Sequence, residues 1–182
     1  MKNYNRQPYG KNGDTTGFRN LEWYKDQVYP LIDDFSSCCV VHGGMQWRRV
    51  LDKCIDVGCG NGRHFPFLAR IFKSIYGIDP VESLSDKYTI PQAWFSKCSL
   101  AEVLPPCRFD GVFFFGSGAI IKRYYGIIQF FQVVMQLVSD TGFICIVSDP
   151  KDGVVFNGLN SLKRVTSDNT TCVDFYSKKE FA

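Results

Sequence analysis

Apolar stretches alternate with helical patterns through the middle of the chain, from residue 50 to residue 147. Short apolar runs predict β-strands over residues 50–57, 74–78, 93–96, 109–115 and 143–147. The run at 109–115 is apolar almost without interruption, which is typical of a strand buried on both faces. Strands that alternate with helical segments indicate a parallel sheet with right-handed crossovers. We therefore expect an α/β fold, with a doubly wound, mostly parallel sheet and helices on both faces.

Apolar residues at helical spacing predict the helices, over residues 21–35, 61–71, 81–87 and 120–138. Pro30 lacks an amide hydrogen, so we expect a break or kink in the first of them. Residues 36–46 are interpreted as a loop. Residues 1–20, rich in Asn, Gly, Lys and Thr, are interpreted as a flexible N-terminal arm, and residues 21–182 as a single domain.

The pattern is less regular after residue 147. Residues 153–156 and 171–176 favour two further strands, whereas residues 177–181 favour the start of a helix. Only 32 residues follow Pro150. We therefore expect a fold that is either minimal or truncated after the strand at 143–147.

Composition narrows the class of protein. The 182 residues are 45% hydrophobic and 21% charged, which argues against a largely disordered chain. A net charge of +3 does not indicate a dedicated binder of nucleic-acid backbones, although it permits a local basic patch. The polar N-terminus and eight cysteines without a C-x-x-C pair favour reduced thiols and a cytoplasmic location. No apolar run reaches the length of a membrane span.

One group of residues is a weak candidate for metal binding. Cys38, Cys39 and His42 lie close together in the sequence. A tetrahedral site needs a fourth ligand and wider spacing, so we interpret these cysteines as small buried residues and expect no metal.

The segment from Asp56 to Gly62 carries the clearest chemistry. It reads Asp-Val-Gly-Cys-Gly-Asn-Gly, and it follows a strand and opens a helix. Glycines there let the backbone turn tightly and approach a ligand closely. Asp79 lies 17 residues beyond Gly62, at the end of the next strand, where its carboxylate can accept from ribose hydroxyls. The pair indicates a nucleoside-binding site at the carboxyl edge of the sheet.

With these motifs, residues 48–150 resemble the class I S-adenosylmethionine-dependent methyltransferases, a Rossmann-like family. The family's first motif is an acidic residue, an apolar residue and G-x-G-x-G, which residues 56–62 match at every position. Later family motifs are similar to residues 76–79, 101–105, 109–115 and 141–144. A nicotinamide dehydrogenase is disfavoured, because its G-x-G-x-x-G places the last glycine one position later.

The resemblance implies a cofactor, S-adenosylmethionine, and a set of residues around it. Gly58 and Gly60 would lie under its methionine part, Asp56 would orient its amino group, and Asp79 would hold the ribose hydroxyls. Ile78 and Pro80 would pack on the adenine. The resemblance also assigns Cys59, Gly62, Ala101 and Phe115 to this site. The family usually has an acidic residue where Leu100 stands, so Ala101 or Glu102 would have to replace that contact.

The methyl acceptor is not identified by the sequence, and neither is a catalytic residue. Residues 116–118 are Gly-Ser-Gly and lack the motifs of the adenine-amino, cytosine-C5 and ribose 2′-hydroxyl enzymes. The remaining acceptors are small molecules, tRNA wobble bases or the cap guanine. In-line transfer depends mainly on proximity and alignment, so a missing general base does not exclude activity. The alternative is a catalytically inactive methyltransferase-like module that binds partners.

Several polar residues near these motifs have two interpretations. His64 follows the glycine motif and is interpreted as a surface or helix-cap residue rather than a general base. Residues 122–125, Lys-Arg-Tyr-Tyr, either contact a substrate or begin a solvated helix. Residues 149–152, Asp-Pro-Lys-Asp, are expected to border the acceptor pocket.

Overall fold

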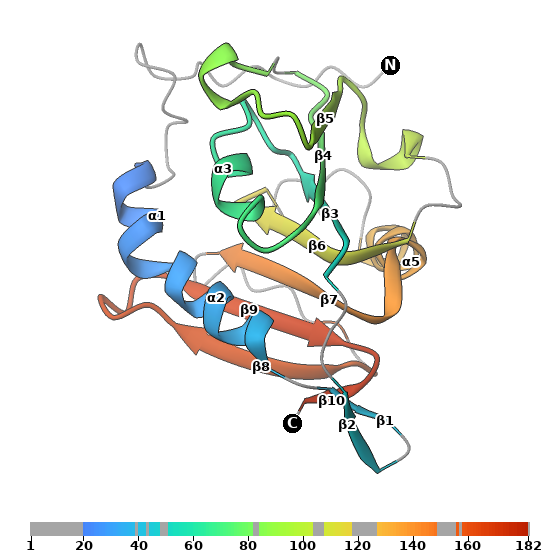
Figure 1. Cartoon of the computed structure of the whole chain (residues 1–182). Coiled ribbons are helices and arrows are strands. Elements are labelled where there is room, and N and C mark those ends of the chain that lie inside the picture. The colour runs from blue at the N-terminus through green and yellow to red at the C-terminus, as the bar shows by residue number, and fades with distance from the viewer. Residues whose placement is uncertain are drawn as a thin grey trace.

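A seven-stranded sheet forms the centre of the computed structural model (Figure 1). The structure describes residues 20–38, 40–42, 44–47, 51–81, 84–103, 108–117, 127–148, 156 and 158–181. The strand order is β5-β4-β3-β6-β7-β9-β8. The strands are β3 (Lys53–Val57), β4 (Ser74–Ile78), β5 (Ala93–Ser96), β6 (Phe109–Phe115), β7 (Val138–Ser148), β8 (Asn160–Val165) and β9 (Cys172–Ser177).

The sheet is parallel from β5 to β7 and antiparallel in its last two strands. β3 pairs in parallel with both β4 and β6, and β6 pairs in parallel with β7. β9 runs antiparallel to β7, and β8 antiparallel to β9. The expected mostly parallel α/β sheet is confirmed. The strand expected over 171–176 is confirmed as β9, whereas residues 153–155 of the other expected strand lie outside the described residues. β8, which pairs with β9, was not expected.

Helices cover the sheet on both faces. α1 (Leu21–Gln27), α2 (Tyr29–Ser37) and α3 (Phe65–Leu68) pack their apolar side chains into one core cluster. α5 (Ile127–Leu137) packs into a second cluster on the other face, through Phe130, Val134 and Leu137. Two short 3-10 helices, η1 (Asp86–Tyr88) and η2 (Leu100–Glu102), flank β5. Successive residues of β6 point alternately into these two clusters, so both faces of the strand are buried. This explains why β6 is apolar at nearly every position.

Several helices differ in extent from the sequence-based expectation. The break expected at Pro30 is confirmed, because α1 ends at Gln27 and α2 places this proline in its first turn. The helix expected over 61–71 is restricted to Phe65–Leu68, since the glycine loop continues to Gly62. In place of a helix at 81–87, the described residues form only η1. Of the expected helix at 120–138, residues 120–126 lie outside the described residues.

A small second sheet was not expected from the sequence. β1 (Val40–His42) pairs antiparallel with β2 (Met45–Trp47) and with β10 (Glu180–Phe181). The loop predicted over 36–46 is therefore wrong, and so is the helix predicted to begin at 177. Val40 pairs with Phe181 and Val41 with Glu180. Segments this short form strands only when distant partners meet, which local periodicity does not reveal.

Side-chain contacts connect α1 and α2 to the hairpin formed by β8 and β9. The indole Nε1 of Trp23 donates to Oδ2 of Asp168 at 3.0 Å, across 145 positions of sequence. Ser167 donates its hydroxyl to the side chain of Gln27, and Arg164 pairs with Asp34 at 2.7 Å. Figure 1 shows α1 and α2 beside β8 and β9. Of the expected arm, only Asn20 is described, and it caps α1 by accepting from the amide of Trp23.

Candidate functional site

The loop between β3 and α3 turns on three glycines with positive φ angles. These angles are 72° at Gly58, 56° at Gly60 and 83° at Gly62, a region that other residues rarely adopt. A Cβ at Gly62 would lie 2.3 Å from Leu84, so this position also excludes a side chain by contact. A Cβ at Gly60 would meet nothing within 4 Å. The loop therefore leaves open space above Gly60, at the carboxyl edge of the sheet.

Asp79 joins this loop to the end of β4. Its Oδ2 accepts from the amide of Gly60 at 3.1 Å, and its Oδ1 accepts from the amide of Val81 at 2.8 Å. The amides of Gly58 and Cys59 both donate to the carbonyl of Ile78. These two amides fix the orientation of the carboxylate at the end of β4. The structure thus brings Asp79 and the glycine loop together.

Asp56 is a fully buried carboxyl group at the end of β3. Its exposed fraction is zero, and neither oxygen has a hydrogen-bond partner among the described residues. Burial raises the pKa of Asp56 to about 8, while the nearby Arg63 opposes this rise. Buried carboxylates without partners are costly and concentrate at functional sites. A cationic donor from a ligand would satisfy this group.

Arg63 and His64 follow the glycine loop and form a connected polar pair. The Nε of Arg63 donates to Nε2 of His64 at 3.2 Å, and Nδ1 of His64 lies 2.8 Å from the hydroxyl of Tyr29. A guanidinium can only donate, so Nε2 is the acceptor and the ring proton lies on Nδ1. Burial lowers the pKa of His64 well below its usual value, and the imidazole is therefore neutral. His64 occupies the N-cap position of α3, but the surface position expected for it is wrong.

Aromatic rings enclose this pair. Phe115, at the end of β6, stacks on His64 with ring centroids 4.0 Å apart. Tyr24 meets the same imidazole edge-on at 4.7 Å, and the guanidinium of Arg63 lies 5.2 Å from the Tyr24 ring centre. Burial raises the pKa of Tyr24 to about 12, so it carries a neutral hydroxyl. The side chains of α1 and α2 therefore form one wall beside the glycine loop.

This wall does not follow from the sequence. The spacing of apolar residues places Tyr24 and Tyr29 only within the helix expected over residues 21–35, and it gives no role to Arg63. Two signals were available in the sequence. Arg63 directly follows the last glycine of the loop, and Pro30 fixes the start of a second helix at Tyr29. Neither signal shows that Arg63 and Tyr29 belong to the same wall, because 34 positions separate them.

The other residues expected around the cofactor differ in how far they are buried. Cys59 is buried, and its sulfur would lie 2.8 Å from a Cβ at Gly77, so its side chain packs into the core. Pro80 and Ala101 are exposed at the same edge of the sheet. Leu100 is buried in the core, and Glu102 accepts from the amide and hydroxyl of Ser99 in a capping box. The described contacts therefore assign Glu102 to capping η2.

Some expectations fall outside the described residues. These are the roles of residues 122–125 and 149–152, and any contribution of Cys39. Within the described part of the chain, no group of three His, Cys, Asp or Glu side chains is arranged to bind a metal ion. In that same part, no helix is long and apolar enough to cross a membrane.

Comparisons with known proteins identify the fold. No protein-family model matches the sequence, and no curated protein matches it. A S-adenosylmethionine-dependent methyltransferase from Aquifex aeolicus superimposes with a TM-score of 0.60 at 12% identity, over 86% of this chain and 92% of that one. The N-methyltransferase NodS from Bradyrhizobium japonicum gives 0.57 at 10% identity, over 90% of this chain and 100% of that one.

Longer proteins share the fold as well. A protein from Anaeromyxobacter dehalogenans, assigned as a type II methyltransferase, gives a TM-score of 0.51 at 16% identity. The match covers 81% of this chain, which spans about half (52%) of the longer one. The chain thus has the Rossmann-like fold of the class I methyltransferases.

Proposed function

We propose that this protein binds S-adenosylmethionine and transfers its methyl group to an acceptor. The observation that carries the proposal is the buried carboxyl group of Asp56, which lies beside the glycine loop and has no hydrogen-bond partner in the described part of the chain. Asp79 supplies the second element, a carboxylate at the carboxyl end of β4 that already contacts the loop through Gly60. The fold shared with methyltransferases supports the same assignment.

The residues present fit this cofactor. Asp56 would accept from the α-ammonium group of the methionine part, and Asp79 would accept from the ribose hydroxyls. The open space above Gly60 permits a ligand to lie against the backbone. Ile78 and Pro80 flank the position proposed for the adenine. When bound, the cofactor supplies an electrophilic methyl group on a sulfonium centre.

The protein's own contribution would be placement of the two reactants. In-line displacement gains most of its rate from proximity and alignment, so a rigid loop and a fixed wall matter more than a base. The neutral imidazole of His64 is enclosed by Phe115 and Tyr24 and holds Arg63 and Tyr29 in place. We assign His64 a positioning role. The acceptor is a small molecule or an RNA base in this proposal.

A binding experiment tests the cofactor assignment directly. Calorimetric titration with S-adenosylmethionine and S-adenosylhomocysteine should show micromolar affinity, and NAD should show none. Asp79→Ala should abolish binding, because the ribose loses its acceptor and the loop loses its link to β4. Unchanged affinity in this variant would contradict the placement of the site. Transfer of a labelled methyl group to candidate small molecules and RNAs then tests catalysis.

A second function is an inactive module that retains the fold. Leu100 favours it, because this buried apolar residue stands where the methyltransferases of the resemblance usually have an acid. Cofactor binding without methyl transfer to any acceptor would support the inactive module. Turnover with one acceptor would exclude it.

A further inference from the structure

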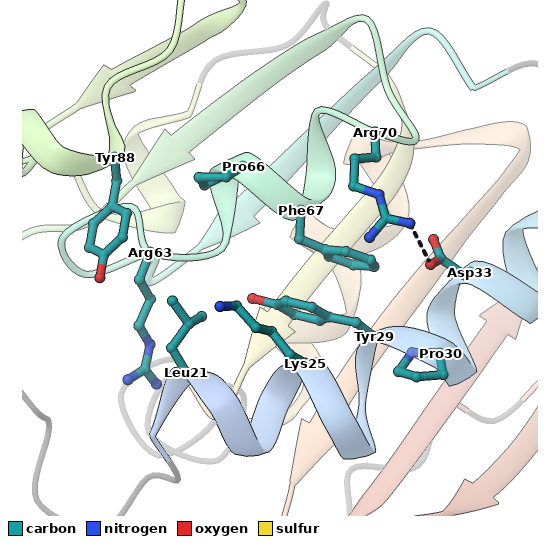
Figure 2. Close-up of a pocket in the computed structure, with 10 residues that line it drawn as sticks. All are labelled: Leu21, Lys25, Tyr29, Pro30, Asp33, Arg63, Pro66, Phe67, Arg70 and Tyr88. Atoms are coloured by element: carbon teal, nitrogen blue, oxygen red, sulfur yellow. Dashed lines mark hydrogen bonds and ion pairs between the residues drawn. The ribbon is translucent and has the colours of Figure 1, made fainter.

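A cavity of about 470 Å³ opens between the amino-terminal helices and α3 (Figure 2). Its walls come from α1, α2, the segment 63–70 and η1. Neither Asp56, Asp79 nor any loop glycine lines it. The cavity is therefore separate from the proposed cofactor site. Its volume lies within the range of sites that bind small molecules.

The walls carry an excess of positive charge. Among the described residues that line the cavity, Lys25, Arg63 and Arg70 are cations and Asp33 is the one carboxylate. Arg70 reaches Asp33 in one contact of 3.4 Å between exposed side chains. Exposed ion pairs of this kind contribute little, so Arg70 can exchange its partner for a ligand anion. Lys25 pairs in the same manner with Glu22, at 2.7 Å between exposed side chains.

Flat aromatic surfaces lie between these cations. The rings of Tyr29 and Phe67 stack with centroids 3.8 Å apart and an interplanar angle of 2°. Figure 2 shows this stack between Arg63 and Arg70, with Tyr88 at the far side of the cavity. The hydroxyl of Tyr29 is held by His64, so this wall is formed before any ligand arrives. Tyr88 is only half-buried and presents a ring to the cavity.

We propose that this cavity binds a nucleotide, with its phosphate on Lys25 and Arg63 and its base on the ring of Tyr88. Arginine and lysine are the usual ligands of phosphate, and aromatic side chains stack on bases without regard to sequence. One nucleotide unit supplies both the anion and the flat ring that the walls offer. The unit is either a free mononucleotide or one residue of a single-stranded RNA. The proposal does not depend on the proposed methyl transfer.

Titration of the full chain with adenosine 5′-monophosphate tests this site. Saturating S-adenosylhomocysteine is added to fill the proposed cofactor site, and the measurement is repeated in Asp79→Ala. Adenosine 5′-monophosphate should bind in both cases, and adenosine or inorganic phosphate alone should bind at least about tenfold more weakly. Loss of binding in Asp79→Ala would overturn the proposal, because the nucleotide would then occupy the ribose site.

Matched variants locate the ligand. Lys25→Met should weaken binding about tenfold, since a charge-assisted contact is lost, and Tyr88→Ala should weaken it by a similar factor, since a stacking surface is lost. Lys73→Met removes another exposed, ion-paired cation, which lies outside the cavity, and should leave binding unchanged. Equal weakening by Lys25→Met and Lys73→Met would show general charge attraction and overturn the proposal.

A short oligoadenylate distinguishes the two sources of the nucleotide. Affinity for the oligonucleotide more than about tenfold above that for the mononucleotide identifies an RNA segment, because neighbouring phosphates add contacts. Equal affinity identifies a free nucleotide. Absence of binding for both probes at millimolar concentration would overturn the proposal. Thermal unfolding of each variant confirms that these surface substitutions leave the fold intact.

Discussion

The hydroxyl of Tyr29 lies 2.8 Å from Nδ1 of His64 and links α2 to the start of α3. Both side chains are buried, with exposed fractions of 6% and 3%. Because the imidazole proton lies on Nδ1, the tyrosine oxygen accepts and satisfies a donor that would otherwise be buried alone. The pair therefore fixes the wall that separates the glycine loop from the nucleotide cavity.

Removal of this acceptor should destabilise the protein. In Tyr29→Phe, Nδ1–H of His64 stays buried without a partner, and we expect a loss of about 1–3 kcal/mol in the free energy of unfolding. Urea denaturation measures this loss. Tyr88→Phe is the control, since no hydrogen bond of that hydroxyl exists in the described part of the chain. An equal effect of both substitutions would contradict the role of the Tyr29–His64 pair.

His64 should make stability depend on pH. Its pKa in the folded chain is well below its usual value, because burial disfavours the cation. Below about pH 6.5 the unfolded chain binds a proton that the folded chain does not, so stability should fall as the pH falls. Asp56 has a raised pKa and acts in the opposite direction. The difference in stability between wild type and His64→Gln isolates His64, and a difference that is constant with pH would refute this prediction.

Gly60 should be needed for ligand binding more than for folding. Gly60→Ala places a Cβ at a positive φ angle, which costs about 1–2 kcal/mol of stability. The new Cβ also enters the open space above the loop, and we expect at least about tenfold weaker binding of S-adenosylhomocysteine.

Gly158→Ala is the matched control for Gly60→Ala. Gly158 has a φ angle of 83°, and a Cβ there also meets nothing within 4 Å. The two variants should lose similar stability, as measured by urea denaturation, while only Gly60→Ala loses affinity in calorimetry. Weakened binding in both would place the ligand elsewhere.

Binding of S-adenosylhomocysteine should weaken below about pH 8. Burial raises the pKa of Asp56 to about 8, so below this pH its carboxyl group is protonated in the free protein. The ammonium group of the ligand needs a carboxylate as its partner, so Asp56 must release this proton on binding. On the acid side we expect about a tenfold loss for each pH unit. Calorimetry between pH 5 and pH 8 measures this loss, and we expect the affinity of Asp56→Asn not to change with pH in this range. The same pH dependence in the variant and the wild type would exclude Asp56 as the partner of the ammonium group.

Gly77 should tolerate no side chain. A Cβ there would lie 2.2 Å from Cζ of Phe65 and 2.8 Å from the sulfur of Cys59, inside the core. Gly77→Ala should cost about 3 kcal/mol or more. The double variant Gly77→Ala with Phe65→Leu removes the closest atom and should recover part of this loss. Independent, additive effects in thermal or urea unfolding would show that the clash with Phe65 is not the cause.

The sequence predicted the parts of the fold that repeat a local pattern. The buried strands β3, β4, β6 and β7, the break at Pro30 and the approach of Asp79 to the glycine loop all follow from apolar runs and motif spacing. β10 and the pairing of Val40 with Phe181 did not follow, since strands of two or three residues exist only through a distant partner.

Only part of the candidate site follows from the sequence. The positions of Asp56 and Asp79 were predicted, because both stand at the ends of recognisable strands. The contact of Tyr29 with His64 was not, because it depends on how a helix outside the sheet packs against the loop. The role of Leu100 as a core residue was also not visible, since its spacing in the sequence is the same for a buried and an exposed side chain.

The hydrogen bond from Trp23 to Asp168 sets an order for the assembly of the chain. α1 is synthesised well before the loop that holds it, because 145 positions separate Trp23 from Asp168. Docking of the amino-terminal helices must therefore wait until β8 and β9 have formed against β7. Until that moment, the wall beside the glycine loop lacks its anchor. Synthesis of the β8–β9 hairpin, rather than emergence of the glycine motif, is then the event that completes the ligand-binding edge.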